Sequence, residues 1–322
     1  MRFASAGIAC CAGMTLFIAG PAAAQAPIGI ATSPVGSLNY SLGNALGKVL
    51  GDKVGLQARV VPFGGGLKIL PSMDAKRFDM AFLSANDTYF AYEGKEDFKG
   101  KPTKNIRVVG VTFPYLLSWY VRKDSPYKSI TDLKGKKIGI GYTANTAQRR
   151  SVLAQMASEG LTEADFDGVM VPHVVRAADD FAQGKIESGS FAIGAGKISE
   201  INVKVGGVRY LSLRDTPDAL AGLRKLMPQS HFIRIKPEPG LVGVLEPINV
   251  QAEDYLVVVG AHVSDDVAYK AAKMLHDNQA DLTAIARAFG RYDPKELARD
   301  RGVPFHPGAE KYYREAKIWP AK

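Results

Sequence analysis

The sequence predicts an α/β protein of two lobes, each a mixed, mostly parallel sheet flanked by helices, with two strands that cross between the lobes. Strand and helix signals alternate along the chain, which is typical of parallel sheets. A strand–turn–helix unit at residues 28–50 recurs at residues 137–159 and indicates a second lobe of the same design. Extended runs at residues 243–250 and 255–261 then return to the first lobe and supply the crossings.

The first lobe opens with a strand–helix–strand unit. Residues 28–32 form a short apolar strand, and Leu38 and Leu42 begin a helix whose apolar residues share one face. The alternating residues 56–62 predict a second strand, which makes the pair parallel. A glycine loop and a further helix lead to a third strand over residues 79–83.

The second lobe follows two consecutive strands, predicted at residues 107–113 and 117–121. A short helix at residues 130–134 leads to the repeated unit, and a strand at residues 168–172 and a helix at about residues 177–183 come next. The predicted boundaries are residues 25–122 for the first part of lobe 1, 123–247 for lobe 2, and 248–322 for the second part of lobe 1 with the C-terminal helices.

An N-terminal export signal is predicted over residues 1–24, so we expect a periplasmic protein. Arg2 supplies the basic start, residues 6–19 are apolar, and small residues end at Ala24, after which cleavage is expected. The apolar run is too short to span a membrane. Both cysteines of the chain lie in this segment, at Cys10 and Cys11. The mature protein is therefore expected to hold no disulfide, thiolate metal site or cysteine nucleophile.

The charge of the chain is moderately basic. The net charge of +9 falls to +8 when Arg2 is removed. Basic residues are interleaved with acidic ones and form no stripe of the kind that nucleic-acid binding needs, so no nucleic-acid partner is expected. A basic, soluble surface is the ordinary interpretation, and a mild attraction for anionic solutes is the alternative.

The first candidate site is the turn that follows the opening strand and runs into a helix. Hydroxyl groups, backbone N–H groups and the positive end of the helix dipole meet there, which suits a small anion. Such residues also cap helices routinely, so capping alone is the alternative. The candidates are Ser33, Gly36, Ser37, Asn39 and Tyr40.

Three further segments of the first lobe are expected near the same point. The glycines at residues 64–66 allow close approach to a ligand or simply make a tight turn. Residues 84–87 end the third strand, at the sheet edge where open α/β folds bind ligands. An aromatic ring near residue 115 supplies a wall or packs at the hinge. The candidates are Gly65, Gly66, Ser84, Asn86 and Tyr115.

The second lobe repeats the hydroxyl-bearing helix start at residues 142–146, which predicts a cleft with one anion-capable wall on each side. Capping is again the alternative. Two basic residues, one just before a helix and one in a glycine-rich turn, are the candidate cations for a carboxylate, although lone charges are mostly solvated. The candidates are Tyr142, Thr143, Ala144, Thr146, Arg176 and Lys197.

Four motifs resemble those of a known family. They are Ser-Pro-x-Gly-Ser-x-Asn-Tyr-x-Leu-Gly at residues 33–43, Asp-Leu-Lys-Gly-Lys at 132–136, Ala-Asp-Asp-Phe at 178–181 and Phe-His-Pro-Gly-Ala-Glu-Lys-Tyr-Tyr at 305–313. On these residues the chain resembles the TAXI-type solute-binding proteins, the extracytoplasmic receptors of TRAP transporters. The resemblance covers nearly the whole mature chain and implies the type II periplasmic-binding-protein fold.

The resemblance also implies a partner, a TRAP membrane subunit that fuses the small and large permeases. Many members have Gly-Thr-x-Gly-Gly in the opening turn, Gln-x-Asp after the third strand and Pro-Gly-Ser-Gly-Thr in the second lobe. This chain departs from that pattern at residues 32–36, 84–87 and 142–146. Because the departures fall among the candidate contacts, the ligand of better-known members is not carried over.

The expected function is capture of a small organic anion, a carboxylate, by hinge closure, followed by delivery to the membrane subunits. Contact with the membrane protein is expected to be peripheral. No catalytic residue, metal ion or cofactor is expected, since the five histidines are far apart in sequence and form no zinc-ligand pattern. Two alternatives stay open: the same scaffold serving an ABC importer or a sensor, and a secreted enzyme on this fold.

Overall fold

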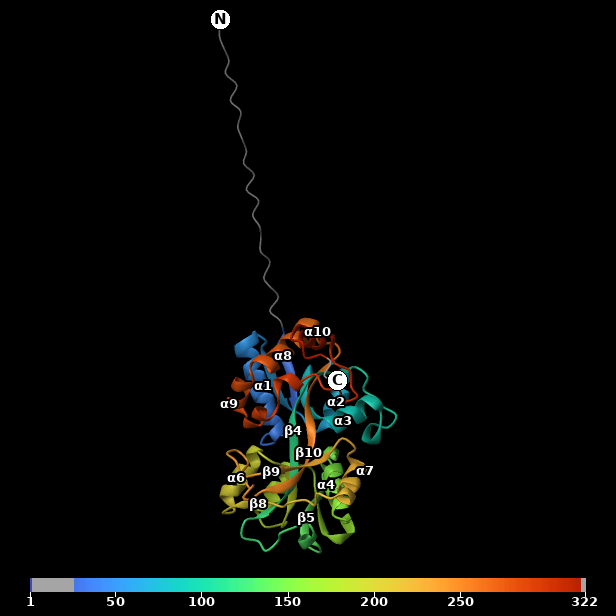
Figure 1. The fold of residues 1–322 in the computed structure, drawn as a ribbon, viewed down its shortest axis with the longest axis vertical. Coiled ribbons are helices and arrows are strands. Elements are labelled where there is room, and N and C mark those ends of the chain that lie inside the picture. Colours follow the sequence, from blue (N-terminus) through green and yellow to red (C-terminus); the bar gives the residue numbers. More distant parts are fainter. Residues whose placement is uncertain (2–25, 320–322) are drawn as a thin grey trace.

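The computed structural model describes Met1 and residues 26–319. Apart from Met1, the export signal expected at residues 1–24, with its two cysteines, lies outside the described residues. The described elements form two lobes, drawn one above the other in Figure 1, and two long strands run between them. Within the described part of the chain, no helix is long and apolar enough to cross a membrane.

The first lobe is built on three parallel strands. β1 pairs with β2 on one side and β3 on the other, so Ile30 lies opposite Val60 and Met80. All five residues of β1 are buried, as in parallel strands that are covered on both faces. The elements here are β1 (Ile28–Thr32), α1 (Leu38–Val54), β2 (Ala58–Pro62), α2 (Gly66–Asp74), β3 (Met80–Ser84) and α3 (Ala85–Glu93).

Two antiparallel strands, β4 (Ile106–Arg122) and β10 (Ile248–Gly260), cross from one lobe to the other. The main path of the large sheet has the order β2-β1-β3-β10-β4-β7. In the first lobe β10 pairs with β3, and in the second lobe it pairs with β9. The same two strands therefore belong to the sheet of each lobe (Figure 1).

The crossing strands are longer than the sequence indicated. The break expected between strands at residues 107–113 and 117–121 is wrong, because β4 runs unbroken through Pro114. Proline cannot donate a backbone hydrogen bond, but the register of β10 shifts just after its partner Asp254, where the ladder is already irregular. Residues 248–260 likewise form one strand.

The second lobe lies around the far halves of β4 and β10. β7 and β8 pair with β4, whereas β5 and β6 form a separate parallel pair. Residues 208–235, for which no helix or strand was predicted, form β8, α7 and β9. The elements are β5 (Lys137–Gly141), α4 (Thr146–Ser158), β6 (Asp167–Val171), α5 (Val174–Ala182), β7 (Gly189–Ala192), α6 (Gly196–Lys204), β8 (Val208–Tyr210), α7 (Pro217–Leu226) and β9 (His231–Ile235).

The C-terminal helices α8 (Asp265–Asp277), α9 (Gln279–Ile285) and α10 (Pro307–Glu315) return to the first lobe (Figure 1). α10 packs closely on α8. A Cβ atom at Gly308 would lie only 2.1 Å from the carbonyl oxygen of Asp265, so glycine is required at this contact.

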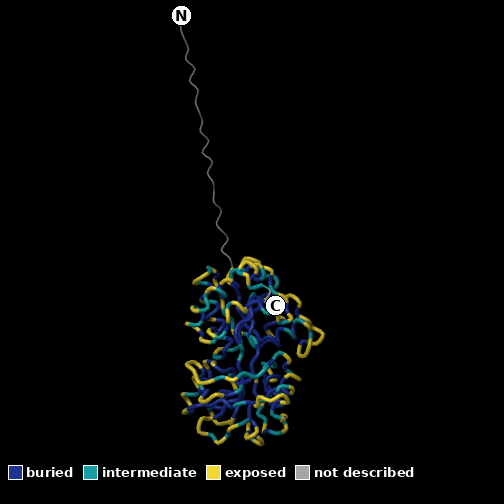
Figure 2. Tube along the Cα trace, in the orientation of Figure 1, coloured by how far each residue is buried: buried dark blue, intermediate teal, exposed yellow. Residues whose placement is uncertain are grey.

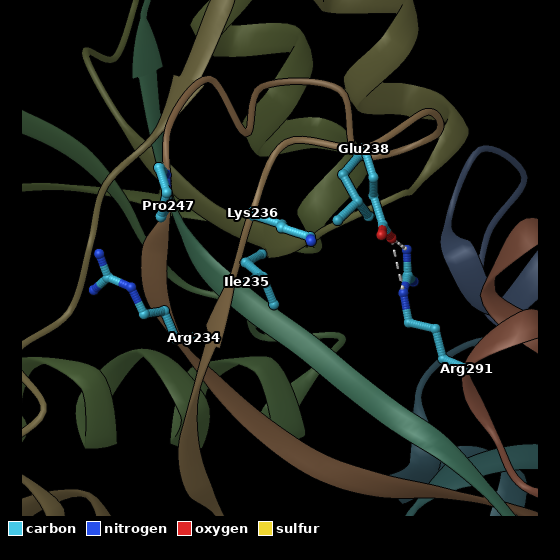
Figure 3. Close-up of a pocket in the computed structure, with 7 residues that line it drawn as sticks. Arg234, Ile235, Lys236, Glu238, Pro247 and Arg291 are labelled. Carbon is cyan, nitrogen blue, oxygen red and sulfur yellow. Dashed lines mark hydrogen bonds and ion pairs between the residues drawn. The ribbon is translucent and has the colours of Figure 1, made fainter.

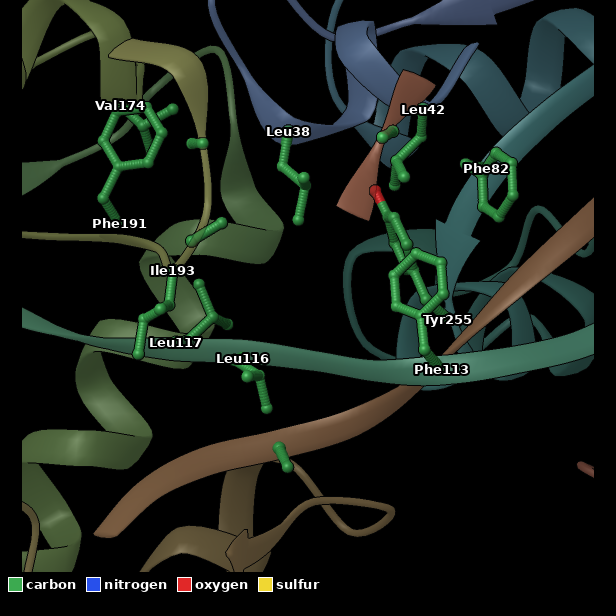
Figure 4. Close-up of a cluster of buried hydrophobic side chains, with 14 of the residues drawn as sticks. Leu38, Leu42, Phe82, Phe113, Leu116, Leu117, Val174, Phe191, Ile193 and Tyr255 are labelled. Carbon is green, nitrogen blue, oxygen red and sulfur yellow. The ribbon is translucent and has the colours of Figure 1, made fainter. Parts of the chain in front are cut away.

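One hydrophobic core extends through both lobes. Figure 2 shows buried chain running through the centre of each lobe, with the exposed chain at the periphery. Figure 4 shows Phe82 and Phe113 in the first lobe and Leu117 and Phe191 in the second, all buried and all part of one cluster that follows β4. Phe82 and Phe113 stack with ring centroids 6.3 Å apart. The lobes therefore share packing along the crossing strands.

The packing of α7 on α4 gives a test of this fold. A Cβ atom at Gly222 would lie 2.5 Å from the carbonyl oxygen of Ala157, so the two helices must separate to admit it. We expect Gly222→Ala to lower the free energy of unfolding by about 1–3 kcal/mol, measured by urea denaturation. Gly51→Ala in α1 is the matched control, because the nearest atom is 4.0 Å away and alanine should stabilise that helix by about 0.5–1 kcal/mol. Equal effects of the two substitutions would contradict the packing.

Candidate functional site

A small polar cavity of about 50 Å³ lies between the lobes, beside the crossing of β4 and β10. Residues from the first lobe, from α4 of the second lobe and from both crossing strands surround it. Such a placement lets a bound solute contact both lobes at once. The lining residues are Ser33, Asn39, Gly65, Gly66, Leu83, Ser84, Asp87, Tyr115, Leu117, Asn145, Ala147, Gln148, Ser151, Glu253 and Tyr255.

Two tyrosines from the crossing strands form one wall of the cavity. The rings of Tyr115 and Tyr255 stack with centroids 4.6 Å apart. The Tyr255 hydroxyl accepts a hydrogen bond from Asn39 Nδ2 at 2.7 Å, and Asn39 Oδ1 accepts one from the backbone N–H of Ser33 at 2.9 Å. Asn39 thus ties the opening turn to β10. Burial raises the pKa of both tyrosines, so both hydroxyls stay neutral.

Two carboxyl groups line the cavity. Glu253 lies on β10, and Asn86 Nδ2 donates to its Oε2 at 2.5 Å. Burial raises the pKa of Glu253 to about 8, and the nearby Asp87 adds to the rise while Asn86 opposes it. Burial likewise raises the pKa of Asp87 to about 6, against the attraction of Arg150. Among the described residues that line the cavity, none carries a positive charge.

The glycines of the predicted loop allow close approach to these groups. A Cβ atom at Gly66 would lie 2.7 Å from Asp87 Oδ2, and one at Gly65 would lie 3.0 Å from Asn145 Oδ1 of the second lobe. Asn145 in turn caps α4 by accepting from the N–H of Gln148 at 3.3 Å. The N-termini of α2 and α4 therefore meet across the cavity.

Polar contacts between the lobes show that they are closed on one another. Arg150 on α4 forms ion pairs with Asp87 and Asp97 of the first lobe, with 3.6 Å between Arg150 Nη1 and Asp87 Oδ1. Its guanidinium also lies over the Phe90 ring, 4.9 Å from the centroid. The backbone N–H of Lys197 donates to the carbonyl oxygen of Gly36 at 3.1 Å. Arg150 is 7% exposed, so water screens its pairs little.

The structure brings part of the predicted site together. Ser33, Asn39, Gly65, Gly66, Ser84 and Tyr115 line the cavity. Asn86 does not line the cavity but donates a hydrogen bond to Glu253, which does. Ser37 caps α1 by accepting from the N–H of Tyr40 at 3.1 Å. Whether any of these residues binds a ligand stays a prediction. The predicted residues that do not line the cavity are Gly36, Ser37, Tyr40, Asn86, Tyr142, Thr143, Ala144, Thr146, Arg176 and Lys197.

The positions expected for the two candidate cations are wrong. Arg176 lies inside the first turn of α5, where it pairs with Asp180 at 3.0 Å and is half exposed. Lys197 lies in the first turn of α6 and pairs with Asp179 and Glu200, each at 2.7 Å. Carboxylates of the second lobe thus neutralise both charges, and neither side chain reaches this cavity.

Tyr142 is part of the core of the second lobe and does not reach the cavity. It is fully buried, and its hydroxyl accepts from the backbone N–H of Ser190 at 3.4 Å. Thr143, Ala144 and Thr146 surround the cap of α4, whereas the residues of this segment that line the cavity are Asn145, Ala147, Gln148 and Ser151. The repeated turn was therefore placed correctly along the chain, but the lining residues within it differ from those expected.

Sequence reasoning missed nine lining residues, and two signals could have found several of them. Gln148 and Ser151 follow Asn145 at intervals of three, which puts polar groups on one face of α4 where apolar residues would suit a buried helix. Glu253 and Asp254 place two acidic residues in a strand, β10, that is otherwise uncharged. The nine residues are Leu83, Asp87, Leu117, Asn145, Ala147, Gln148, Ser151, Glu253 and Tyr255.

A larger pocket of about 510 Å³ lies beside β9 and the loop that follows it. Figure 3 shows Glu238 of this loop pointing at Arg291 of the first lobe, and the Arg291 Nη2–Glu238 Oε1 distance is 2.5 Å. Arg234 and Lys236 are exposed. Because its charges are either solvated or already paired, this pocket is a weaker candidate than the cavity with buried polar groups from both lobes.

The Arg150 ion pairs give a test of lobe closure. Removing one partner of a buried pair costs about 3–5 kcal/mol, because a charge is left uncompensated. In Arg150→Gln the closed form would hold Asp87 buried without its cation, whereas water can solvate that carboxylate in the open form, so we expect the variant to shift toward an open form. Small-angle X-ray scattering should give a larger radius of gyration. Arg149→Gln is the matched control, since Arg149 pairs within its own lobe with Glu163. Equal radii of gyration for the two variants would show that the Arg150 ion pairs do not hold the lobes closed.

Three solved structures resemble this one. A structure titled as that of a periplasmic transporter is 16% identical, covers 90% of this chain and 92% of its own, and has a TM-score of 0.54. PhnD1 from Prochlorococcus marinus, in complex with methylphosphonate, is 10% identical, covers 90% and 98%, and also has a TM-score of 0.54. A protein from Bordetella bronchiseptica is 13% identical, covers 91% and 98%, and has a TM-score of 0.50.

These likenesses confirm the two-lobed periplasmic-binding-protein fold that the sequence predicted, with helices around mixed sheets and two crossing strands. At such low identity they show the fold alone. The family match, in contrast, rests on the sequence and covers most of the chain. The family model matches residues 30–316, and the chain belongs to the NMT1-like family.

Proposed function

We propose that this protein is an extracytoplasmic solute-binding receptor that captures a small organic solute between its lobes and delivers it to a membrane transporter. The observation that carries the proposal is the polar cavity lined from both lobes at the crossing of β4 and β10. Contacts on both lobes favour the closed form over the open one, which is how a ligand drives hinge closure.

The ligand that we propose is a small carboxylate. The N-termini of α1, α2 and α4 lie at the cavity through Asn39, Gly65 and Asn145, and helix N-termini attract anions. PhnD1, which shares the fold, holds the small anion methylphosphonate. No cation lines the cavity within the described part of the chain, so backbone N–H groups, hydroxyls and amides would have to bind the carboxylate.

An enzyme on the same scaffold is the less supported alternative. The hydroxyls of Ser33, Ser84 and Ser151 line the cavity, but none of the lining residues is a histidine that could act as their base. Among the described residues, no group of three or more histidine, aspartate, glutamate or cysteine side chains is placed to hold a metal ion. The cavity is thus better suited to holding a solute than to turning one over.

A thermal-shift screen of small carboxylates tests the proposed ligand class. A carboxylate that binds the folded protein should raise the melting temperature. At a hundredfold excess over the dissociation constant it should add about 2.7 kcal/mol to the free energy of unfolding. Ser151→Leu, which fills the cavity from α4, should abolish the shift. Lys197→Ala is the control and should keep it, because Lys197 lies outside the cavity. Loss of the shift in Lys197→Ala would instead restore Lys197 as a ligand contact.

The transporter partner that we propose is a TRAP membrane subunit with fused small and large permeases, which would make this chain a TAXI-type receptor. The motif resemblance at residues 33–43 and 305–313 supports this subtype. Membership of the NMT1-like family and the shared fold suit an ABC importer or a sensor equally well.

Gene neighbourhood separates the two transporter classes. For a TAXI-type receptor we expect the adjacent gene to encode a single membrane protein with the fused permeases. Reconstituted in proteoliposomes, that subunit should take up solute only when this protein is added outside. A neighbouring ATPase subunit, with uptake driven by ATP hydrolysis, would reject the TRAP assignment and favour an ABC importer.

A further inference from the structure

Glu253 is a carboxyl group held between the lobes with its orientation fixed. It is 1% exposed and lines the cavity from β10. Asn86 donates to it through Nδ2, and the Oδ1 of the same amide accepts from the backbone N–H of Gln229 at 3.1 Å. The amide of Asn86 therefore cannot turn around, and it presents its donor to Glu253. The second-lobe residue Ser230 also contacts this amide at 3.3 Å.

Among residues 26–319, no positively charged side chain is placed to balance Glu253. The groups that face it are Asp87 from α3, the Tyr115 hydroxyl from β4 and the Tyr255 hydroxyl from β10. The cation in this region, Arg150 from α4, is taken up by Asp87 and by Asp97 behind it. An ionised Glu253 would be a buried charge beside a second carboxylate, which is strongly unfavourable. For this reason its pKa is raised to about 8.

A carboxylate solute would bring a third negative charge to the same cavity. With Glu253 ionised, that charge would be repelled, because no lining side chain compensates it. With Glu253 protonated, the repulsion disappears and the acid offers one more hydrogen-bond donor. A carboxylic acid that donates to a carboxylate makes a short, charge-assisted hydrogen bond.

We propose that Glu253 takes up a proton when the lobes close and donates it in a hydrogen bond to the carboxylate of the bound solute. This inference rests on the proposed function and names how the same cavity accepts an anion without a cation. The proton comes from bulk water during closure and returns there on opening, when water reaches Glu253 again. Capture is therefore coupled to the uptake of one proton.

Calorimetry tests the coupling, with acetate and succinate as probes and methylammonium as their cationic counterpart. At pH 7 we expect carboxylate binding to take up about one proton, read from the difference between phosphate and Tris buffers. The affinity should fall about tenfold per pH unit from pH 6 to pH 8. In Glu253→Gln, which cannot titrate, proton uptake should fall to the small share of Asp87, and the pH dependence between pH 7 and pH 8 should vanish. Glu246→Gln, at an exposed position away from the cavity, should behave as the unaltered protein.

A variant cross-linked in the closed form tests whether Glu253 is protonated when no ligand is bound. A Cβ atom at Gly36 would lie 3.6 Å from the Cβ of Lys197 in the other lobe, which is within the range of a disulfide. Residues 26–319 contain no cysteine, so Gly36→Cys with Lys197→Cys gives one cross-link. Gly36 has φ of 90°, where cysteine is strained, so the reduced form of the same variant is the control.

In the oxidised variant, Glu253 is held at its raised pKa, whereas its unfolded value is near 4.5. The folded protein then binds more protons than the unfolded chain between these values, so stability falls as the pH rises toward 8. We expect the folding equilibrium constant to fall about tenfold from pH 6 to pH 7 and about fivefold from pH 7 to pH 8. Adding Glu253→Gln should remove this fall.

The outcomes separate this inference from the proposed function. If the stability of the cross-linked protein depends on pH equally with and without Glu253→Gln, the inference is overturned, whether or not carboxylates bind. A carboxylate that binds without proton uptake also overturns it and leaves the receptor function standing. Binding of methylammonium alone, with release of a proton, shows that the proposed carboxylate ligand is wrong, and the donor role of Glu253 falls with it.

Discussion

The antiparallel pairing of β4 with β10 is the constraint on which the rest of the structure depends. Both strands belong to the sheets of both lobes, so the core continues across the hinge, and side chains at the crossing are shared between the lobes. Tyr115, Glu253 and Tyr255 lie there and face the cavity. In the proposed function, a solute bound at this place would contact the two strands that join the lobes, which would couple its binding to closure.

Closure also decides the electrostatics of the cavity. Asp87 and Glu253 would be ordinary carboxylates in water, but the closed lobes remove that water and supply only one cation, Arg150, which Asp87 and Asp97 occupy. The pKa values of both lining acids rise as a result. The burial that closes the cavity to water is thus also the cause of the raised pKa values of its two acids.

Local patterns predicted the parts of the site that depend on local structure. The turn before α1, the glycines before α2 and the end of β3 were expected near a ligand, and Ser33, Gly66 and Ser84 do line the cavity. These positions follow from strand order and helix starts, which leave periodic signals in the sequence. Arg176 and Lys197 do not line the cavity. Their long side chains can pair in many directions, and they pair with Asp180 and Asp179 of their own lobe.

The sequence by itself determined most of the alternation of strands and helices and the strand–turn–helix unit that recurs in each lobe, because hydrophobic periodicity and turn residues act over short distances along the chain. Only the tertiary structure decided which polar groups share the cavity. Asn86 and Glu253 are 167 residues apart, and Asn39 and Tyr255 are 216 apart, yet each pair forms a hydrogen bond. Such contacts depend on the pairing of β10 with β3, which joins segments far apart in the sequence, and no local pattern encodes that pairing.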